Sequence, residues 1–231
     1  MGMKLLSTLN SEIDKNVKTA LYRDVAKYIL KSCDDLNATE AASSSGKYHP
    51  IADLGYQGLI RHSKMVAELV NIMVRAIPQY DSAMEHDIVY ISALLHDMCK
   101  YEAKEGEEKV NTNSDHPTKM MELVRKASKD YIVELEAAGK PAMTDEQKTR
   151  YEADWERVAS NIGSHMSRWN EIKDYSSGRP KVVGYNPLPT TFEQYIIVFA
   201  DLISANATLP ETMFDMKNEA IGYITGRLKA E

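Results

Sequence analysis

Residues 88–100 read Ile-Val-Tyr-Ile-Ser-Ala-Leu-Leu-His-Asp-Met-Cys-Lys, an apolar helical run that ends in an imidazole and a carboxylate. Packing alone gives no reason for placing His96 and Asp97 there, with Lys100 three residues further on. Divalent cations bind neutral imidazole and carboxylate oxygens well, and the end of a helix can direct both groups into one site. His96 and Asp97 are therefore the predicted centre of a metal site.

The composition around this run favours helices. The chain has 231 residues and 43% of them are hydrophobic, which is enough for one large domain with a sizeable core. Strictly alternating runs of β-branched residues are few, which argues against a large sheet. We expect an all-α fold, a helical bundle in one domain over residues 1–231, with its core at about 59–208.

Charge and cysteine content limit the partners and the compartment. The net charge of −6 argues against a surface that coats nucleic acid. Cys33 and Cys99 form no disulfide framework, so a reducing, cytoplasmic context is expected. No apolar run approaches the ~20 residues that span a membrane, and the first residues lack a signal-peptide core. The expectation is a soluble cytoplasmic protein without a membrane partner; a homo-oligomer stays possible.

The first half of the chain is expected to form three helices. Residues 11–33 carry apolar side chains at helical spacing, with Ser11 as the N-cap. Residues 34–58 are rich in Ala, Ser and Gly and are expected to be a loop. A second helix covers about 59–76, and a capping box formed by Ser82 and Glu85 begins the third.

The second half is expected to contain a projecting helical hairpin. Pro117 suits a first helical turn, so His116 should open a helix. Capping boxes at Thr144 and Thr191 begin two more helices, with Gln147 and Gln194 as their partners. The inserted hairpin is placed at about 127–158. An irregular loop is expected over 170–191, and a last helix over 211–229.

Four further residues are candidate ligands. His62 lies on the apolar stripe of the second helix, His116 at a helix start and His165 at a helix end. Each could be a structural histidine when taken alone. Asp201 lies inside a very apolar helix, where a carboxylate is costly unless it is paired or bound to metal. We expect these four to join His96 and Asp97. His49, in the loop before the second helix, could line the site, although a surface position is expected, and the pair His86-Asp87 is interpreted as structural.

The order of these motifs resembles the HD-domain superfamily of metal-dependent phosphohydrolases. Leu94-Leu95-His96-Asp97 followed by Lys100 is similar to the core motif of that family, and Ala200-Asp201 is similar to its closing aspartate. The resemblance covers roughly residues 60–205. It implies a helical bundle in which His62, His96, Asp97 and Asp201 hold one metal ion.

Some members of the family have two additional histidines, which His116 and His165 match. By this resemblance Asp97 would bridge two metals, with His116 and His165 on the second. Members with a single metal use such histidines to contact phosphate, so the resemblance implies one or two divalent ions. Manganese, iron, cobalt, nickel and magnesium all suit mixed imidazole and carboxylate ligands.

The implied activity is hydrolysis of a phosphorylated small molecule, a nucleotide or related phosphoester, by a metal-activated water. Asp97 and Lys100 would act in catalysis, and Lys100, Arg168 and Arg61 would contact the substrate. Trp169 and Tyr185 could stack on a base, although core packing is expected for Trp169. Two alternatives remain open: an HD-type oxygenase with a di-iron centre, and a non-catalytic nucleotide-binding module.

Overall fold

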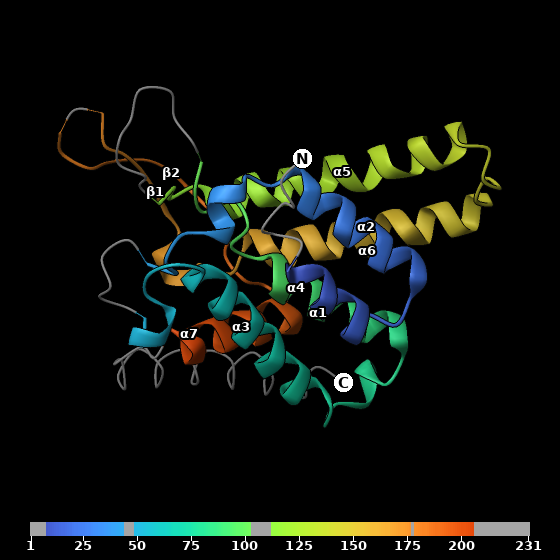
Figure 1. Ribbon diagram of the computed structural model, residues 1–231, viewed down its shortest axis with the longest axis horizontal. Helices are drawn as coiled ribbons and strands as arrows, with labels where there is room; N and C mark the ends of the chain where they lie inside the picture. Colours follow the sequence, from blue (N-terminus) through green and yellow to red (C-terminus); the bar gives the residue numbers. More distant parts are fainter. Residues whose placement is uncertain (1–7, 44–48, 103–111, 177, 206–231) are drawn as a thin grey trace.

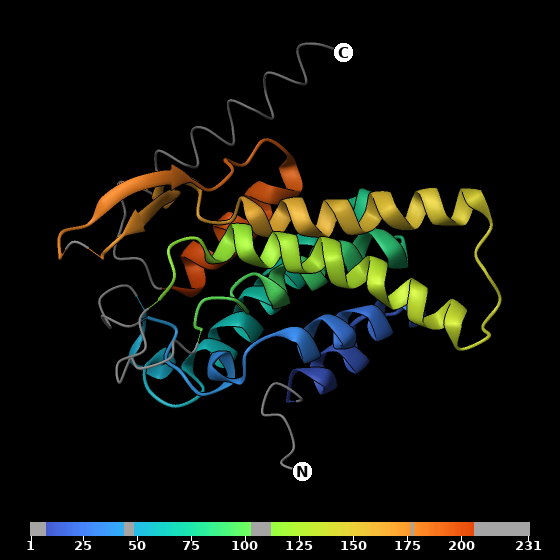
Figure 2. The ribbon, with the colours of Figure 1, turned by 90° about the horizontal axis from the view of Figure 1, so that it is seen from above.

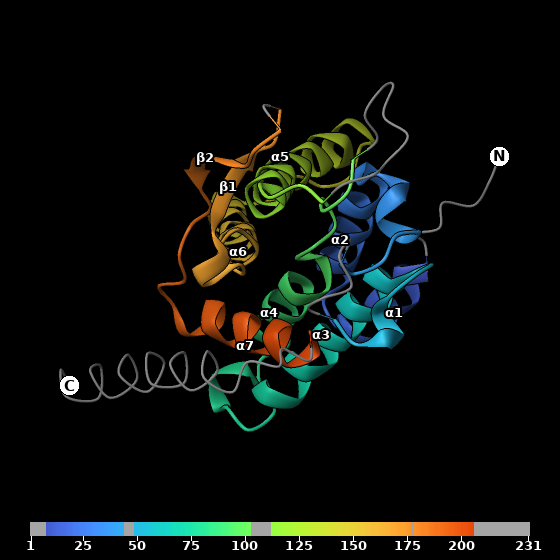
Figure 3. The ribbon, with the colours of Figure 1, turned by 90° about the vertical axis from the view of Figure 1, so that its left-hand side faces the viewer.

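Helix α4, Ala83–Leu95, lies at the centre of the molecule. The computed structural model describes residues 8–43, 49–102, 112–176 and 178–205. Every residue of α4 from His86 to Leu95 is buried. The helix packs against five others, as Figure 3 shows: α1 (Thr8–Asn16), α2 (Ala20–Ser32), α3 (Gly58–Val74), α6 (Asp145–Gly163) and α7 (Phe192–Ser204). The apolar run of the sequence is thus the centre of an all-α bundle.

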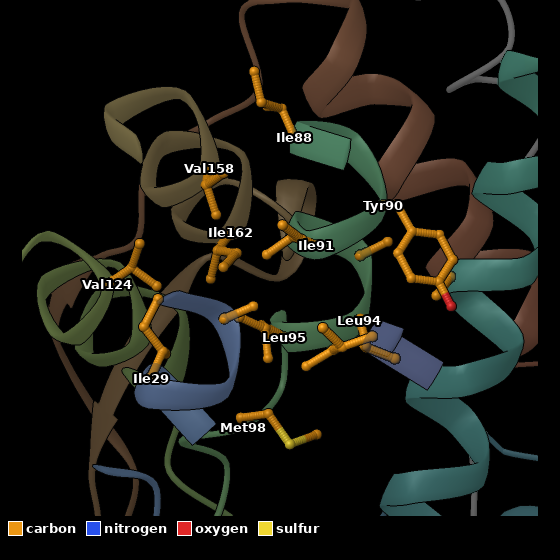
Figure 4. Packing of buried hydrophobic residues seen from close by; sticks show 14 of the residues in the cluster. Ile29, Ile88, Tyr90, Ile91, Leu94, Leu95, Met98, Val124, Val158 and Ile162 are labelled. Atoms are coloured by element: carbon orange, nitrogen blue, oxygen red, sulfur yellow. The ribbon is translucent and has the colours of Figure 1, made fainter. Parts of the chain in front are cut away.

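The side chains of α4 join the two sides of this bundle. Figure 4 shows Ile91 and Leu95 directed toward Val158 and Ile162 of α6, while Tyr90 points toward α3. All five side chains are buried. The turn that follows α4 carries His96 and Asp97, so the packing of α4 fixes the position of both groups.

The single helix expected at 11–33 is wrong, because the chain forms α1 and α2 with a break at residues 17–19. The break is made by a side chain from another helix. Asp87 of α4 accepts hydrogen bonds from the backbone N–H groups of Lys18 (2.9 Å) and Thr19 (2.7 Å). These are donors at the start of α2 that have no intrahelical partner. The pair His86-Asp87 is structural, as predicted.

The loop expected over residues 34–58 contains two short 3₁₀ helices, η2 (Asp35–Ala38) and η3 (Ile51–Asp53). Helix α3 begins at Gly58, and a Cβ there would lie 1.9 Å from the carbonyl oxygen of Asp53. Glycine is therefore required for η3 to pack this closely against the first turn of α3.

Helices α5 (His116–Ala137) and α6 pack against each other and extend past the rest of the bundle (Figures 1 and 2). The capping box of Thr144 and Gln147 is confirmed at the start of α6. The hairpin expected at about 127–158 is the outer part of these two helices. Their inner ends carry His116 and His165, so the pair also contributes to the candidate site.

The capping box expected from Ser82 and Glu85 is wrong. Ser82 precedes α4 but makes no capping hydrogen bond. Glu85 instead accepts a hydrogen bond from Arg157 of α6 (2.6 Å), which also contacts Glu193 of α7. Glu85 of α4, which the sequence pattern predicts to cap its own helix, thus takes part in an ion-pair network that links α4, α6 and α7.

The irregular loop expected over 170–191 is a β-hairpin in part. Strands β1 (Glu171–Asp174) and β2 (Lys181–Tyr185) pair antiparallel, with Glu171 opposite Tyr185 and an irregularity between Ile172 and Lys173. Val182 and Val183 favour a strand, and Gly178 takes a positive φ of 77° in the connection between the strands.

The last described helix is α7, which begins at the predicted capping box of Thr191 and Gln194. The helix expected at 211–229 lies outside the described residues. Among the described helices, none combines the length and the apolar character needed to cross a bilayer.

Candidate metal centre

His62 of α3 is fully buried and faces α7. Its Nδ1 lies 3.0 Å from the hydroxyl oxygen of Ser204, and its Nε2 lies 3.0 Å from Oδ1 of Asp201. Both partners belong to α7, three residues apart and hence on one face of that helix. The packing of α3 against α7 therefore places the imidazole of His62 beside the carboxylate of Asp201.

His96 follows α4 directly and is also fully buried. Its Nδ1 hydrogen bonds to the carbonyl oxygen of Ala93 (2.7 Å), so Nδ1 carries the proton and Nε2 is free to bind a cation. That Nε2 lies 3.9 Å from Oδ1 of Asp201 and 3.5 Å from Oδ2 of Asp97. His62, His96 and Asp201 thus form one compact ligand group.

His116 and His165 form the other side of the site. His116 begins α5 and His165 follows α6, and their Nε2 atoms lie 3.2 Å apart. Their Nδ1 atoms hydrogen bond to the carbonyl oxygens of Asn113 (2.6 Å) and Ile162 (2.7 Å). The pattern found at His96 is repeated: each Nδ1 is held by backbone, and each Nε2 faces the site.

Asp97 lies between the two sides and presents one oxygen to each. Its Oδ1 is 2.9 Å from Nε2 of His116 and 3.3 Å from Nε2 of His165. Its Oδ2 is 3.5 Å from Nε2 of His96 and 3.8 Å from that of His62. Ligand bonds of ~2.0–2.2 Å to one ion place ligand atoms about 3–4 Å apart, so these separations suit a shared carboxylate.

The donor set fits metal binding by a second criterion, the lack of partners outside the site. Nε2 of His62, Nε2 of His96 and Oδ1 of Asp97 are buried and form no well-aligned hydrogen bond with a described residue; their near polar neighbours are other members of the same cluster. Polar atoms buried without a partner are rare in folded proteins and call for an explanation. A divalent cation would satisfy all three atoms at once.

The protonation states of the site also suit a cation. Burial lowers the pKa of His96 to about 4, so its imidazole is neutral at pH 7. Burial raises the pKa of Asp97, but Lys100 and His96 outweigh this and hold it well below its usual range. The pKa of Asp201 is lowered too, because His62 and His96 outweigh its burial. Both carboxylates are ionised, as metal ligands must be.

The pKa values of His116 and His165 shift in opposite directions. Burial lowers the pKa of His116 in spite of the contact with Asp97. For His165, burial lowers the pKa but Asp97 and Asp201 raise it by more, so its pKa lies above the usual value. Within this pair, His165 is therefore the imidazole that holds a proton more readily when no cation is bound.

The residues expected to contact the substrate occupy three different environments. Lys100 lies at the site, with Nζ 2.6 Å from Oδ2 of Asp97. Arg168 is exposed on the 3₁₀ helix η5 (Ser167–Trp169), directly after His165. Arg61 donates hydrogen bonds to the carbonyl oxygens of Tyr56 (2.8 Å) and Leu54 (3.2 Å), which fasten the segment before α3.

Two residues at the site were not predicted from the sequence. Ser204, the partner of His62, could have been found from its position one turn after Asp201 on the same helix. His49, interpreted as a surface residue, lies against His62 with ring centroids 4.7 Å apart; no spacing pattern indicates this. The core packing expected for Trp169 is wrong, because this side chain is 42% exposed.

Comparison with family models matches the chain to the HD domain over residues 59–206. Comparisons with curated proteins and with solved structures give no match. The matched region covers more than half of the chain and runs from α3 to the end of α7, so it contains all six clustered residues. The chain therefore belongs to the HD domain family of metal-dependent phosphohydrolases.

Proposed function

We propose that this protein is a metal-dependent phosphohydrolase that acts on a nucleotide or a related phosphoester. The observation that carries the proposal is the position of Asp97, whose two carboxylate oxygens face two different groups of imidazoles. A carboxylate in this position can be shared by two cations about 3.5–4 Å apart, the spacing of two-metal hydrolytic sites.

In this proposal each group of residues holds one ion. His62, His96 and Asp201 would hold the first, His116 and His165 would hold the second, and Asp97 would contribute to both. Bound divalent ions lower the pKa of a water ligand toward ~7 and offset negative charge on phosphoryl oxygens. Manganese, iron, cobalt, nickel and magnesium all suit this ligand set, and we expect ions from that group.

The protein contributes orientation and charge of its own. Backbone carbonyls fix the proton on Nδ1 of three ligand histidines, and Ser204 holds the fourth. This removes the entropic cost of orienting four rings when an ion binds. The ammonium of Lys100 lies beside the shared carboxylate, where it can bind an oxygen of the phosphoryl group and stabilise charge that develops during hydrolysis.

A nucleotide is the proposed substrate because exposed aromatic and basic residues follow His165. Trp169 and Tyr185 are 42% and 66% exposed, and Arg168 lies next to Trp169. An exposed aromatic face can stack on a base, and a guanidinium can bind phosphate. Arg168 is proposed as a substrate-binding residue; Arg61 is proposed to act through the segment that it fastens.

The test is phosphate release from mono-, di- and trinucleotides after loading the purified protein with each of the five metals. Wild type should release phosphate from at least one nucleotide, and Asp97→Ala should abolish release. Asp81→Ala, which removes an exposed carboxylate before α4, serves as the control and should keep wild-type activity.

Three results would contradict the proposal. Full activity in Asp97→Ala would refute the role of the shared carboxylate. Oxygen consumption by the iron-loaded protein together with no phosphate release would favour the di-iron oxygenase instead. Nucleotide binding without turnover under any metal would favour a binding module.

A further inference from the structure

We propose that His49 binds the phosphoryl group of the substrate by donating a hydrogen bond to one of its non-bridging oxygens. This inference rests on the proposed function and extends it, since no sequence motif of the site includes His49. The residue belongs to the segment before α3, outside the region matched by the family model. Its ring lies 4.7 Å from that of His62 between centroids, edge to face.

His49 has no hydrogen-bond partner in the described part of the chain. Both of its ring nitrogens are buried, and neither forms a hydrogen bond with a described residue. The other five histidines of the chain each hydrogen bond through at least one ring nitrogen, four of them at the site and His86 to Asn71. Two buried ring nitrogens without a partner cost free energy unless a ligand satisfies them.

The segment that carries His49 is held in place by its contacts with α3. Directly after it, Pro50 leads into η3, which packs on the first turn of α3 at Gly58. The N–H of Ala42 donates to the carbonyl oxygen of Asp53 (2.9 Å), on the other side of the same segment. Arg61 of α3 binds the two carbonyls that follow η3. The segment is thus fastened on both sides within one turn of His62.

The position of His49 follows from its contact with the site. Its ring packs edge to face on that of His62, and Nε2 of His62 lies 3.0 Å from Oδ1 of Asp201. His49 therefore adjoins an imidazole and a carboxylate that are proposed to hold one ion, where its ring nitrogens can meet a phosphoryl oxygen that approaches that ion.

His49 differs from the proposed metal ligands in its distance from the shared carboxylate. Nε2 of each of the four ligand histidines lies within 3.8 Å of an oxygen of Asp97. Among the described residues His49 makes no such contact with a carboxylate, although its ring contacts that of His62. A residue that adjoins the ligands without joining them is placed to contact what the ions bind, and for a phosphohydrolase this is the phosphoryl group.

The test measures binding of inorganic phosphate to the manganese-loaded protein by calorimetry at pH 7.5, with bound metal counted in the same samples. His49→Ala should weaken phosphate binding by about 10- to 100-fold, because it removes a hydrogen bond to a charged acceptor. Its metal content should equal that of wild type. His49→Gln, which restores an N–H donor, should recover part of the affinity. Ile51→Ala, an exposed neighbour in the same segment, should change neither quantity.

Three outcomes overturn the inference. Wild-type phosphate affinity in His49→Ala means that the ring does not contact phosphate, and nucleotide hydrolysis by wild type would then still support the proposed function. Loss of a metal ion from His49→Ala means that the ring is a ligand. Wild type that binds metal but neither binds phosphate nor hydrolyses nucleotides overturns both proposals.

Discussion

Replacing Asp87 by Ala should destabilise the fold without removing metal from the site. The Asp87 carboxylate is fully buried and accepts hydrogen bonds from the N–H groups of Lys18 (2.9 Å) and Thr19 (2.7 Å). Burial raises its pKa, but hydrogen bonds with His86, Lys18 and Thr19 outweigh burial and lower it, so the group is ionised at neutral pH. Both bonds therefore have a charged acceptor.

The magnitude follows from these two bonds. A hydrogen bond to a charged group contributes about 1.5–3 kcal/mol, so Asp87→Ala should lower the free energy of unfolding by about 3–6 kcal/mol. Asp87→Asn keeps one acceptor oxygen and should lose about half of that amount. The control is Asp81→Ala, an exposed carboxylate whose loss should change stability by less than about 0.5 kcal/mol.

The assay is urea unfolding followed by circular dichroism, with bound metal counted in the folded protein. The chain has two His-Asp pairs. His86-Asp87 is expected to stabilise the fold, and His96-Asp97 is expected to bind metal. An Asp87→Ala variant within about 1 kcal/mol of wild type would refute the first assignment. A folded Asp87→Ala variant without metal would show that the two pairs are not separable.

Three further predictions concern pH, the partner of His62 and the core. The pKa of His96 is about 4 in the folded protein because the side chain is buried, whereas it is near 6.5 in the unfolded chain. As the pH falls from 7 to 5, only the unfolded chain binds a proton at this residue. The metal-free protein should therefore lose up to about 2 kcal/mol of stability from this group over that interval. Urea unfolding at both pH values measures this loss, and equal stability would contradict it. Ser204→Ala removes the partner of His62 Nδ1 and should weaken metal binding by about 10- to 100-fold in a metal titration; an unchanged affinity would show that the ring needs no support. Trp155→Ala opens a cavity beneath α6, since this side chain is 2% exposed, and should cost about 3–5 kcal/mol by urea unfolding; a loss below 1 kcal/mol would contradict the packing described.

The clustering of the candidate site residues could be predicted because its members interrupt strong helical patterns. His62, His96 and Asp201 each stand in an apolar stretch where packing would favour another residue, and His116 is marked by the proline that follows it. The structure brings all of them together with Asp97 and His165. Helix periodicity and ligand chemistry are local signals, and both can be recognised in a single sequence.

The errors arise where a residue far along the chain decides the local structure. The break between α1 and α2 depends on Asp87, about 70 positions away, and Glu85 leaves its expected cap for Arg157. The approach of His49 to His62 depends on the packing of η3 at Gly58. None of these contacts has a spacing rule that links the partners.

The β-hairpin was missed for a different reason. Its strands are short, and Pro180, Gly178 and Gly184 dominate the composition of the segment, which is typical of a loop. The signal for β2 was limited to Val182 and Val183, too few residues to outweigh those breakers. Cross-strand pairing with β1 supplies the remaining stabilisation.

The most direct test of the shared carboxylate is a count of metal ions per chain by elemental analysis. The protein would be stripped with chelator, reloaded with each of the five metals in turn, and freed of excess metal. Wild type should bind two ions, His165→Ala should keep one through His62, His96 and Asp201, and Asp97→Ala should bind none tightly. Two ions in Asp97→Ala, or none in wild type with any of the five metals, would contradict the account.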